Sequence, residues 1–507
     1  MENHSEIYFR TNLLKKTLQG LLIAFLVVIR IPVVSAQNNT LYLIHSIPQA
    51  NQLNPALMHP CRIYISLPVI SSLRGNVRNT GFGFHDVFYT DPRDQPGDYS
   101  LDLDKLDNTL RKMNYSLANA DVDLLGLGFP LRDWYITFLI SSHSSSQLSY
   151  PHDVVLLQDS YWNLNTATPG PIDLHNLEAN STAWNSIGIS ASREVRKGFR
   201  VGARVKYLNG MANVTTPQSA INLNASSNPP NLRAVVDYRI NSSLPVTLGY
   251  SPGGLLDDIG FEPAIQNLAS NYLFTSNHGI AIDAGITYEL DEITQLSASV
   301  TDLGFIRWKK NVTYFSVNET FEFSQADLNQ IIIDPGQDGL TNALQDSVSN
   351  TINASASTNS YFTATPVNLY GGITRQLLPN LKAGAMTWIE INSWHVRPSL
   401  TLSLNFTPFE AFAATVSYTL MNNKFNQIGT GLAFGNRGAQ FYVITDNIVV
   451  RYINDTESSL RWPYNARMMS LRFGMNLFFG CNDKKENPGG KKRWPGVKSR
   501  DECPAYW

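Results

Sequence analysis

The stretch Leu400-Thr-Leu-Ser-Leu-Asn-Phe406, followed by Phe412-Ala-Ala-Thr-Val-Ser-Tyr-Thr-Leu420, decides the fold. Residues 400–406 place an apolar side chain at every even position and a polar one at every odd position. A period of two predicts a β-strand with one apolar and one polar face. The same alternation occurs at 200–207, 280–288 and 469–479. The chain is therefore predicted to be all-β.

These alternating runs have the length and chemistry of membrane-spanning strands. They are about nine to twelve residues long, whereas strands of globular proteins cluster near five or six and a tilted strand needs about 9–11 to cross a bilayer. Their polar faces carry charged residues, and aromatic residues stand near their ends, where a barrel places its interfacial girdles. We therefore expect a closed antiparallel up-and-down transmembrane β-barrel whose apolar face meets lipid. The alternative is a soluble secreted β protein with its apolar face in a core.

The connections between the runs predict the strand count. Short links occur at 131–133, 196–198, 291–292, 378–380, 408–410 and 436–438. They mostly interleave with longer connections, as the short turns and long external loops of outer-membrane barrels do. We count about fourteen strands, or sixteen if residues 217–240 form two further spans instead of an external hairpin.

The two ends of the chain predict export. Residues 1–36 have the parts of a secretory signal peptide: a basic start, the apolar run 20–29 and small residues before the cleavage point. We then expect an N-terminal periplasmic or plug segment at 37–60, the barrel at 61–479 and a basic periplasmic tail at 480–507. The expected location is the cell outer membrane, with both termini in the periplasm.

Composition excludes several classes of protein. The chain is 43% hydrophobic and 16% charged, too apolar for a disordered chain. After residue 36 no run offers the ~18 consecutive apolar residues of a membrane helix. Lys plus Arg number 39 against 41 Asp plus Glu. This balance gives no reason to expect nucleic acid as a partner.

Neither the cysteines nor a search for known motifs indicates a metal site or a catalytic site. Three cysteines occur, and an exported chain favours a disulfide between Cys481 and Cys503, with Cys61 left free. No zinc-type spacing, phosphate loop, dinucleotide fingerprint or nucleophile elbow is present. Gly429-Thr-Gly431 lies inside an alternating strand and is interpreted as small lumen-facing residues. We expect no metal, no cofactor and no catalytic residue.

Several motifs resemble a known family. They are Asn54-Pro-Ala56, Val300-Thr-Asp-Leu-Gly-Phe-Ile-Arg-Trp308, Tyr418-Thr-Leu-Met-Asn-Asn423, and Pro463-Tyr-Asn-Ala-Arg467 leading into Leu471-Arg-Phe-Gly-Met-Asn476. Over nearly the whole mature chain the sequence resembles an uncharacterised Bacteroidota outer-membrane β-barrel family, a domain of unknown function (DUF5723-like). More remotely it is similar to the long-chain fatty-acid transporter and type IX secretion barrel superfamily. The resemblance implies a fold and a location and carries no catalytic residues.

The polar faces of the strands supply the candidate binding residues of the lumen. These are Arg204, Lys206, Asp283, Tyr370, Lys382, Met386, Trp388, Glu390 and Arg472. Asp283 and Glu390 are expected to form salt bridges with Arg204, Lys382 or Arg472. The candidates for a plug in the barrel mouth are Asn54, Pro55 and Ala56.

Two functions follow from a barrel without catalytic motifs. The first is a channel or transporter for a small or lipophilic solute, and the second is a scaffold for an envelope complex, associated with secretion. The expected partners are outer-membrane lipid and an envelope or secretion-complex protein. The competing class is a membrane-embedded lipid hydrolase or acyltransferase, for which His85, His143 and His278 are unpaired candidates.

Overall fold

The computed structural model describes most of the chain. The described residues are 39–59, 63–89, 100–157, 171–227, 230–244, 246–250, 256–261, 275–324, 353–356, 359–392, 395–409, 411–421, 425–435, 438–448, 452–454, 461–463 and 467–480. Among them, no helix is long and apolar enough to cross a membrane. The expected signal peptide and the three cysteines lie outside the described residues.

Strands dominate the described chain, and its few helices are short. The helices are α2 (Asn39–Tyr42), η1 (Pro48–Gln52), α3 (Phe84–Val87), α4 (Leu103–Thr109) and η2 (His152–Leu157). The strands of the main sheet are β1 (Ile63–Ser66), β2 (Leu73–Asn79), β5 (Met113–Leu131), β6 (Trp134–Pro151), β7 (Ile172–Asp173), β8 (Glu178–Arg196), β9 (Phe199–Ser227), β10 (Pro230–Ser243), β13 (His278–Glu289), β14 (Thr294–Trp308), β15 (Val312–Ser324), β16 (Asn353–Ala356), β17 (Tyr361–Ala364), β18 (Val367–Leu378), β19 (Leu381–Asn392), β20 (His395–Phe409), β21 (Phe412–Met421), β22 (Phe425–Phe434), β23 (Ala439–Thr445) and β26 (Met468–Phe479). Three small hairpins pair β3 (Phe88–Tyr89) with β4 (Ser100–Leu101), β11 (Val246–Tyr250) with β12 (Leu256–Phe261), and β24 (Tyr452–Asn454) with β25 (Arg461–Pro463).

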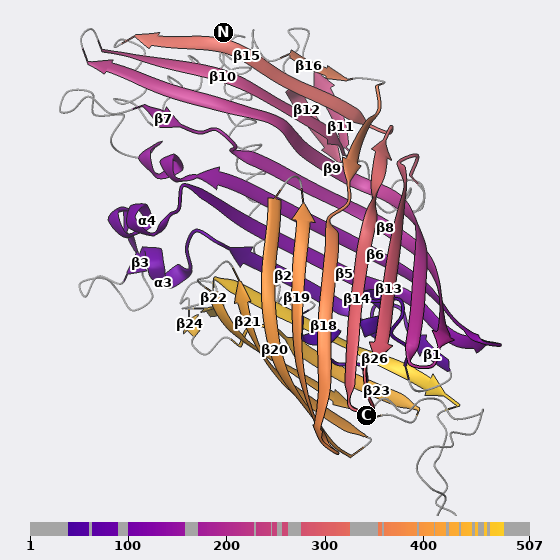
Figure 1. Cartoon of the computed structure of the whole chain (residues 1–507). Helices are drawn as coiled ribbons and strands as arrows, with labels where there is room; N and C mark the ends of the chain where they lie inside the picture. Colours follow the sequence, from indigo (N-terminus) through magenta and orange to yellow (C-terminus); the bar gives the residue numbers. More distant parts are fainter. Residues whose placement is uncertain are drawn as a thin grey trace, which may run out of the picture.

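The main sheet closes into an antiparallel barrel of fourteen strands. β1 and β2 together form the first strand, interrupted at residues 67–72, and both pair with β5 on one side and with β26 on the other. From β5 to β26 each barrel strand pairs with the next along the chain. Figure 1 shows the tilted wall that results. The predicted fold class is confirmed.

One strand belongs to the barrel and to an outer sheet. Residues 199–209 of β9 pair with β13, whereas residues 213–227 pair with β10. β10 pairs in turn with β15, and Figure 1 shows these strands extending past the upper end of the barrel. Residues 217–240, which were expected to form either two further spans or an external hairpin, therefore form a hairpin outside the closed wall. The strand count is fourteen.

The apolar face of the wall points outward. On β20, Leu400, Leu402 and Leu404 are 46%, 51% and 52% exposed, whereas Thr401 and Ser403 are 0% and 6% exposed. A soluble sandwich would bury the leucines and expose the threonine and serine. Because the reverse holds, the barrel is built to meet an apolar surrounding with its outer face.

Candidate functional site

The first described residues, 39–59, lie inside the barrel, and we call them the luminal segment. The Gln49 carboxamide donates to Asn476 Oδ1 on β26 at 2.7 Å. The Asn54 carboxamide donates to the carbonyl of Ile286 on β13 at 3.2 Å. β13 and β26 are the sixth and fourteenth barrel strands, so these two contacts reach well-separated parts of the wall. The luminal segment therefore crosses the lumen.

Glycines on the inner wall make room for the luminal segment. A Cβ atom at Gly285 would come within 2.0 Å of Asn54 Oδ1, and one at Gly202 within 2.4 Å of the Pro55 carbonyl carbon. Such distances are not compatible with a side chain at either position. The segment lies against four other inner glycines as well: Gly372, Gly384, Gly429 and Gly431. The wall is thus shaped to the segment.

One side of the luminal segment packs into an apolar cluster. Its buried members from the segment are Leu41, Tyr42, Leu43, Ile44, Ile47, Ala50, Leu53 and Leu57. The wall contributes Tyr370, Met386, Trp388, Met421, Ala433, Tyr442 and Ile444. The rings of Tyr42 and Tyr370 stack at 5.1 Å with an interplanar angle of 10°. The apolar part of the lumen is therefore occupied by the chain itself.

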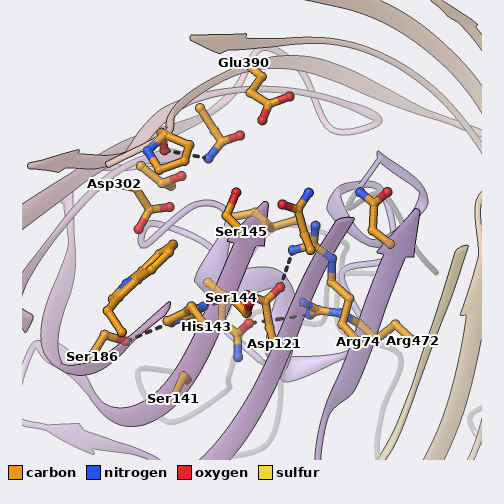
Figure 2. Close-up of a pocket in the computed structure, with 18 of the residues that line it drawn as sticks. Arg74, Asp121, Ser141, His143, Ser144, Ser145, Ser186, Asp302, Glu390 and Arg472 are labelled. Carbon is orange, nitrogen blue, oxygen red and sulfur yellow. Dashed lines mark hydrogen bonds and ion pairs between the residues drawn. The ribbon is translucent and has the colours of Figure 1, made fainter. Parts of the chain in front are cut away.

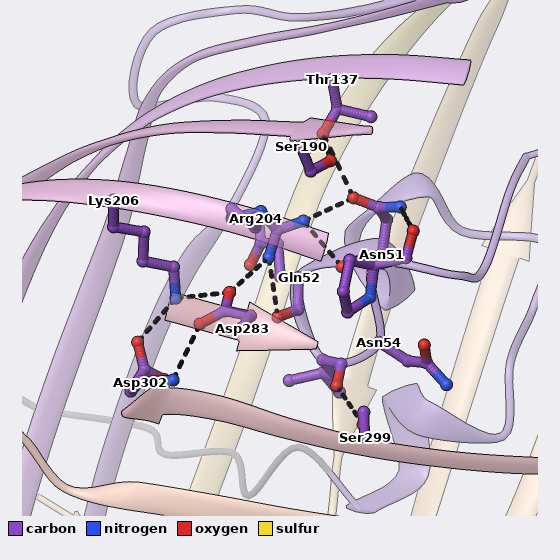
Figure 3. A network of polar contacts seen from close by, with 12 residues as sticks. Asn51, Gln52, Asn54, Thr137, Ser190, Arg204, Lys206, Asp283, Ser299 and Asp302 are labelled. Atoms are coloured by element: carbon purple, nitrogen blue, oxygen red, sulfur yellow. Dashed lines mark hydrogen bonds and ion pairs between the residues drawn. The ribbon is translucent and has the colours of Figure 1, made fainter. Parts of the chain in front are cut away.

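The other side of the segment is held by a buried ion network (Figure 3). Arg204 donates to Asp283 at 3.0 Å and also to the carbonyls of Asn51 and Gln52 at 2.8 and 3.1 Å. Lys206 lies 2.8 Å from the same Asp283 carboxylate. A buried guanidinium needs such partners to offset its lost hydration. Arg204 therefore ties the segment to β9 and β13 at once.

A β-bulge brings a second carboxylate to Lys206. The register of β13 on β14 shifts between Ile282 and Ala284. Opposite this shift, Asp302 has a φ of 62° and donates its backbone N–H to Asp283 Oδ1 at 2.8 Å. Its carboxylate then lies 2.6 Å from Lys206 Nζ. Bulges re-aim side chains in this way.

Two histidines of the luminal segment are kept neutral by burial. Burial lowers the pKa of His59 to about 4, although Ser46 O accepts a hydrogen bond from the ring. Burial, with the nearby positive charge of Lys382, lowers the pKa of His45 to about 3. Protonation of either ring inside the barrel would place a charge in a site that disfavours it. Both histidines are therefore neutral while the segment lies inside the barrel.

A chamber lined largely by polar residues, and partly open to solvent, adjoins the luminal segment. Gln52 and Leu53 of the segment form part of its lining. Its cationic side chains are Arg74, Arg78, Arg204, Lys206 and Arg472, and its carboxylates are Asp121, Asp123, Asp302 and Glu390. Trp184, Tyr370 and Trp388 supply aromatic surface. Most of the lining residues are therefore polar or charged.

A histidine relay lies in the chamber wall (Figure 2). His143 on β6 bonds Asp121 Oδ1 on β5 through Nδ1 at 2.7 Å, and Ser186 Oγ on β8 through Nε2 at 3.0 Å. Asp121 also accepts from Arg74. The order acid, imidazole and hydroxyl is that of a hydrolase triad. The expectation that His143 is unpaired was therefore wrong.

A polar contact also joins strands across the lumen. Arg397 on β20 donates to Gln147 Oε1 on β6 and lies 3.2 Å from Glu390. Its guanidinium is 5.5 Å from the ring centre of Tyr115 on β5. Because β6 and β20 are not neighbours in the wall, this contact narrows the lumen beside the chamber.

The structure places the predicted residues as follows. Arg204, Lys206, Tyr370, Trp388, Glu390 and Arg472 line the chamber. Asp283 is fully buried beneath it, and Met386 packs in the apolar cluster. Lys382 is not part of the chamber lining and lies near His45. Asn54, Pro55 and Ala56 are buried in the luminal segment, while Cys481 and Cys503 lie outside the described residues.

One of the two expected side-chain pairings needs correction. Asp283 pairs with Arg204, as expected, and also with Lys206. Glu390 pairs with Arg397 and with neither Lys382 nor Arg472. Arg397 follows Glu390 by only seven residues in the adjacent strand, so its register on β19 brings the two together.

Several residues of the chamber escaped the sequence analysis. Arg74 and Arg78 lie on β2, which is short and weakly alternating, and Asp302 stands in a bulge that breaks the period of two.

The two other candidate histidines of a hydrolase are His278 and His85. His278 contacts the Tyr207 hydroxyl, and the His85 side chain lies outside the described part of the structure. Among the described residues, no group of three His, Cys, Asp or Glu is placed to hold a metal ion.

Comparisons with solved structures find distant barrels. The toluene transporter TbuX of Ralstonia pickettii is 8% identical over 85% of this chain and 94% of its own, with a TM-score of 0.38. A FadL homologue of Pseudomonas aeruginosa is 11% identical over 86% and 94%, with a TM-score of 0.35. The CymD monoaromatic hydrocarbon channel is 9% identical over 89% and 98%, with a TM-score of 0.40. At such scores the function must be argued from the geometry of this chain.

The family is shown by sequence. No curated protein matches the chain. The profile of a family of unknown function, DUF5723, matches residues 55–446. This match begins at Pro55 in the luminal segment and ends at Asp446, just after β23, so it includes most of the barrel and much of the chamber wall. The chain belongs to the DUF5723 family of unknown function.

Proposed function

We propose that this protein is a solute channel of the outer membrane whose lumen is closed by the luminal segment acting as a plug. Two features of the wall support the location. Its outward face is apolar and suits lipid, and it is closed, as a sheet inside lipid must be if all its backbone hydrogen bonds are to be satisfied. The chamber beside the segment supports transport, because it offers a polar space within that wall.

The observation that carries the proposal is the way the luminal segment is seated. It is held by side-chain hydrogen bonds, by Arg204 and by fitted glycines, and it adds no strand to the wall. Such contacts can be given up without breaking a single wall hydrogen bond. A barrel that serves only as a scaffold requires neither a fitted segment nor a charged chamber.

Conductance in planar bilayers tests the proposal. We expect the full chain to conduct poorly and a variant lacking residues 39–58 to conduct steadily. A second variant, Gln49→Ala/Asn51→Ala/Asn54→Ala, keeps the chain length and removes polar contacts of the segment. Arg193→Ala, an exposed site, serves as the matched control.

The same measurement separates the channel from the scaffold. If both plug variants fold, as judged by heat-modifiable migration in gels, yet neither conducts more than the full chain, the channel is refuted. An envelope or secretion complex would then be the better proposal. Its first test is co-purification of a stoichiometric protein partner from native outer membranes.

The histidine relay favours a second candidate function, an esterase within the chamber. Ser186 Oγ would attack an ester carbonyl while His143 Nε2 takes its proton, and Asp121 would hold the imidazole by its Nδ1–H. His143 would then return the proton to the leaving alcohol. Water would hydrolyse the acyl group from Ser186 and restore the hydroxyl.

Labelling with a fluorophosphonate probe tests this second function. We expect Ser186 to be labelled in the full chain and the label to be lost in Ser186→Ala and His143→Ala. Ser145→Ala is the matched control, because Ser145 also lines the chamber and does not bond His143. Equal labelling of Ser186→Ala and the unaltered chain, or no labelling at all, excludes the esterase.

A further inference from the structure

The cationic side chains of the chamber differ in whether a carboxylate compensates them. Arg74, Arg204 and Lys206 each lie within 4 Å of one. In the part of the chain that the structure describes, Arg78 and Arg472 form no ion pair within that distance, although they are only 5% and 3% exposed. Two buried guanidinium groups thus lack a direct ion pair, although Glu390 lies near enough to Arg78, and Asp121 and Asp123 near enough to Arg472, for their charges to act on them.

The hydrogen bonds that Arg78 and Arg472 make are few and weak. Arg78 Nη1 points at the sulfur of Met421, and Arg472 Nη1 lies 3.5 Å from Gln52 Oε1. The Nε atoms of both arginines are buried without a hydrogen-bond partner. Buried charged groups are normally paired, because their lost hydration is costly. The pair therefore has unused capacity to donate to an anion.

The sheet register places both arginines on the same inner wall. Arg74 on β2 pairs directly with Arg472 on β26. Arg74, Asn76 and Arg78 alternate along β2, so their side chains share the inner face. Both arginines line the chamber, and Asn76 between them has an unbonded side-chain oxygen. The two guanidinium groups therefore face the same chamber from positions four residues apart in the register of β2.

We propose that the chamber binds a small hydrophilic organic oxyanion, a carboxylate or a phosphate, through Arg78 and Arg472. Guanidinium groups match these anions in charge and in planar, forked geometry. The inference deepens the proposed channel function by naming its solute class. While the luminal segment is seated, the apolar cluster around Met386 is filled and offers no site to an apolar solute.

Isothermal titration calorimetry of the full chain in detergent tests the site. We expect succinate to bind and succinamide, its neutral counterpart, not to bind. Arg78→Gln and Arg472→Gln should each weaken succinate binding at least tenfold, and Arg472→Lys should weaken it less. Arg193→Gln, exposed and outside the chamber, should bind as the unaltered chain does. Inorganic phosphate in a parallel titration tells which oxyanion is preferred.

The outcomes separate this site from the channel. Equal binding of succinamide, unchanged binding in both glutamine variants that fold, or no saturable binding of either oxyanion overturns the site. Oxyanion binding that depends on Arg78 and Arg472, with no conductance in the plug variants, retains the site and refutes the channel. Conductance in the plug variants without oxyanion binding retains the channel and refutes the site.

Discussion

The two sides of the lumen are filled in different ways. Strands β20 to β23 present hydroxyl groups and glycines, such as Thr401 and Gly431, and the luminal segment packs directly on them. Strands β2 to β9 present charges, and there the chamber remains. The difference teaches that this lumen is closed mainly by apolar packing along β20 to β23, where Arg397 is a charged exception, and by ion pairs along β2 to β9. Each prediction below weakens one of the two sides.

The largest effect is expected from Arg204→Ala. The substitution leaves Lys206 as the remaining cation paired with the buried Asp283 and removes three hydrogen bonds to the luminal segment. Breaking a buried pair costs about 3–5 kcal/mol. Urea unfolding of the folded barrel measures this loss. Arg193→Ala breaks an exposed pair with Asp133 and should cost less than about 1 kcal/mol; similar losses in the two variants would contradict the role of Arg204.

A cavity on the neutral side should have the next largest effect. Ile47 is 1% exposed in the apolar cluster, and Ile47→Ala should cost about 3 kcal/mol of packing. We expect faster proteolytic cleavage within residues 39–59 and an unchanged barrel. Leu402→Ala, on the outer face, is the control and should leave cleavage of the segment unchanged. Unaltered protection of the segment in Ile47→Ala would show that apolar packing does not hold it.

Acid should loosen the luminal segment. The pKa of His59 is lowered to about 4 in the folded protein, so this ring is neutral there while the unfolded or released chain takes up a proton below about pH 6.5. The stability that His59 contributes is complete above pH 6.5 and falls as the pH decreases toward 4. At pH 5 the expected loss is about 2 kcal/mol.

Proteolysis of the segment at pH 7.5 and pH 5 measures this loss. The double variant His45→Gln/His59→Gln should lose most of the difference between the two pH values. Retention of the full acid effect in that variant would assign it to carboxylates of the chamber instead.

The smallest effect is expected from Lys382→Gln. The charge of Lys382 helps to lower the pKa of His45, so its removal should raise that pKa toward its usual value. The acid sensitivity of the segment should then decrease by a few tenths of a kcal/mol. The same proteolysis assay measures it, and a larger acid sensitivity in the variant would contradict the assignment.

The barrel was predictable because many of its strands keep a period of two over about nine to twelve residues. β20 shows it from Leu400 to Phe406 and β21 from Ala414 to Leu420, and the exposed and buried residues there follow the sequence pattern. The inner-face residues of these regular strands could thus be assigned from the pattern alone. The outer hairpin at 217–240 could not, because an external sheet uses the same alternation as a membrane strand.

The partners of inner residues could not be predicted from periodicity. His143 meets Asp121 because the register of β6 on β5 pairs these two positions, and register is not visible in either strand alone. Asp302 faces Lys206 only because a bulge turns it inward. Arg397 reaches Gln147 across the lumen, and that contact depends on the closure of the wall.

The contact between Gln49 and Asn476 joins residues 427 positions apart, and it sets an order of folding events. Part of the binding surface for the luminal segment belongs to β26, the last strand, so it is complete only when β26 has closed on β1 and β2. Contacts of such high sequence separation form slowly, since the loop between them must first be closed. The first described residues of the chain are therefore among the last to reach their final position, and the newly closed wall has an open lumen until they do.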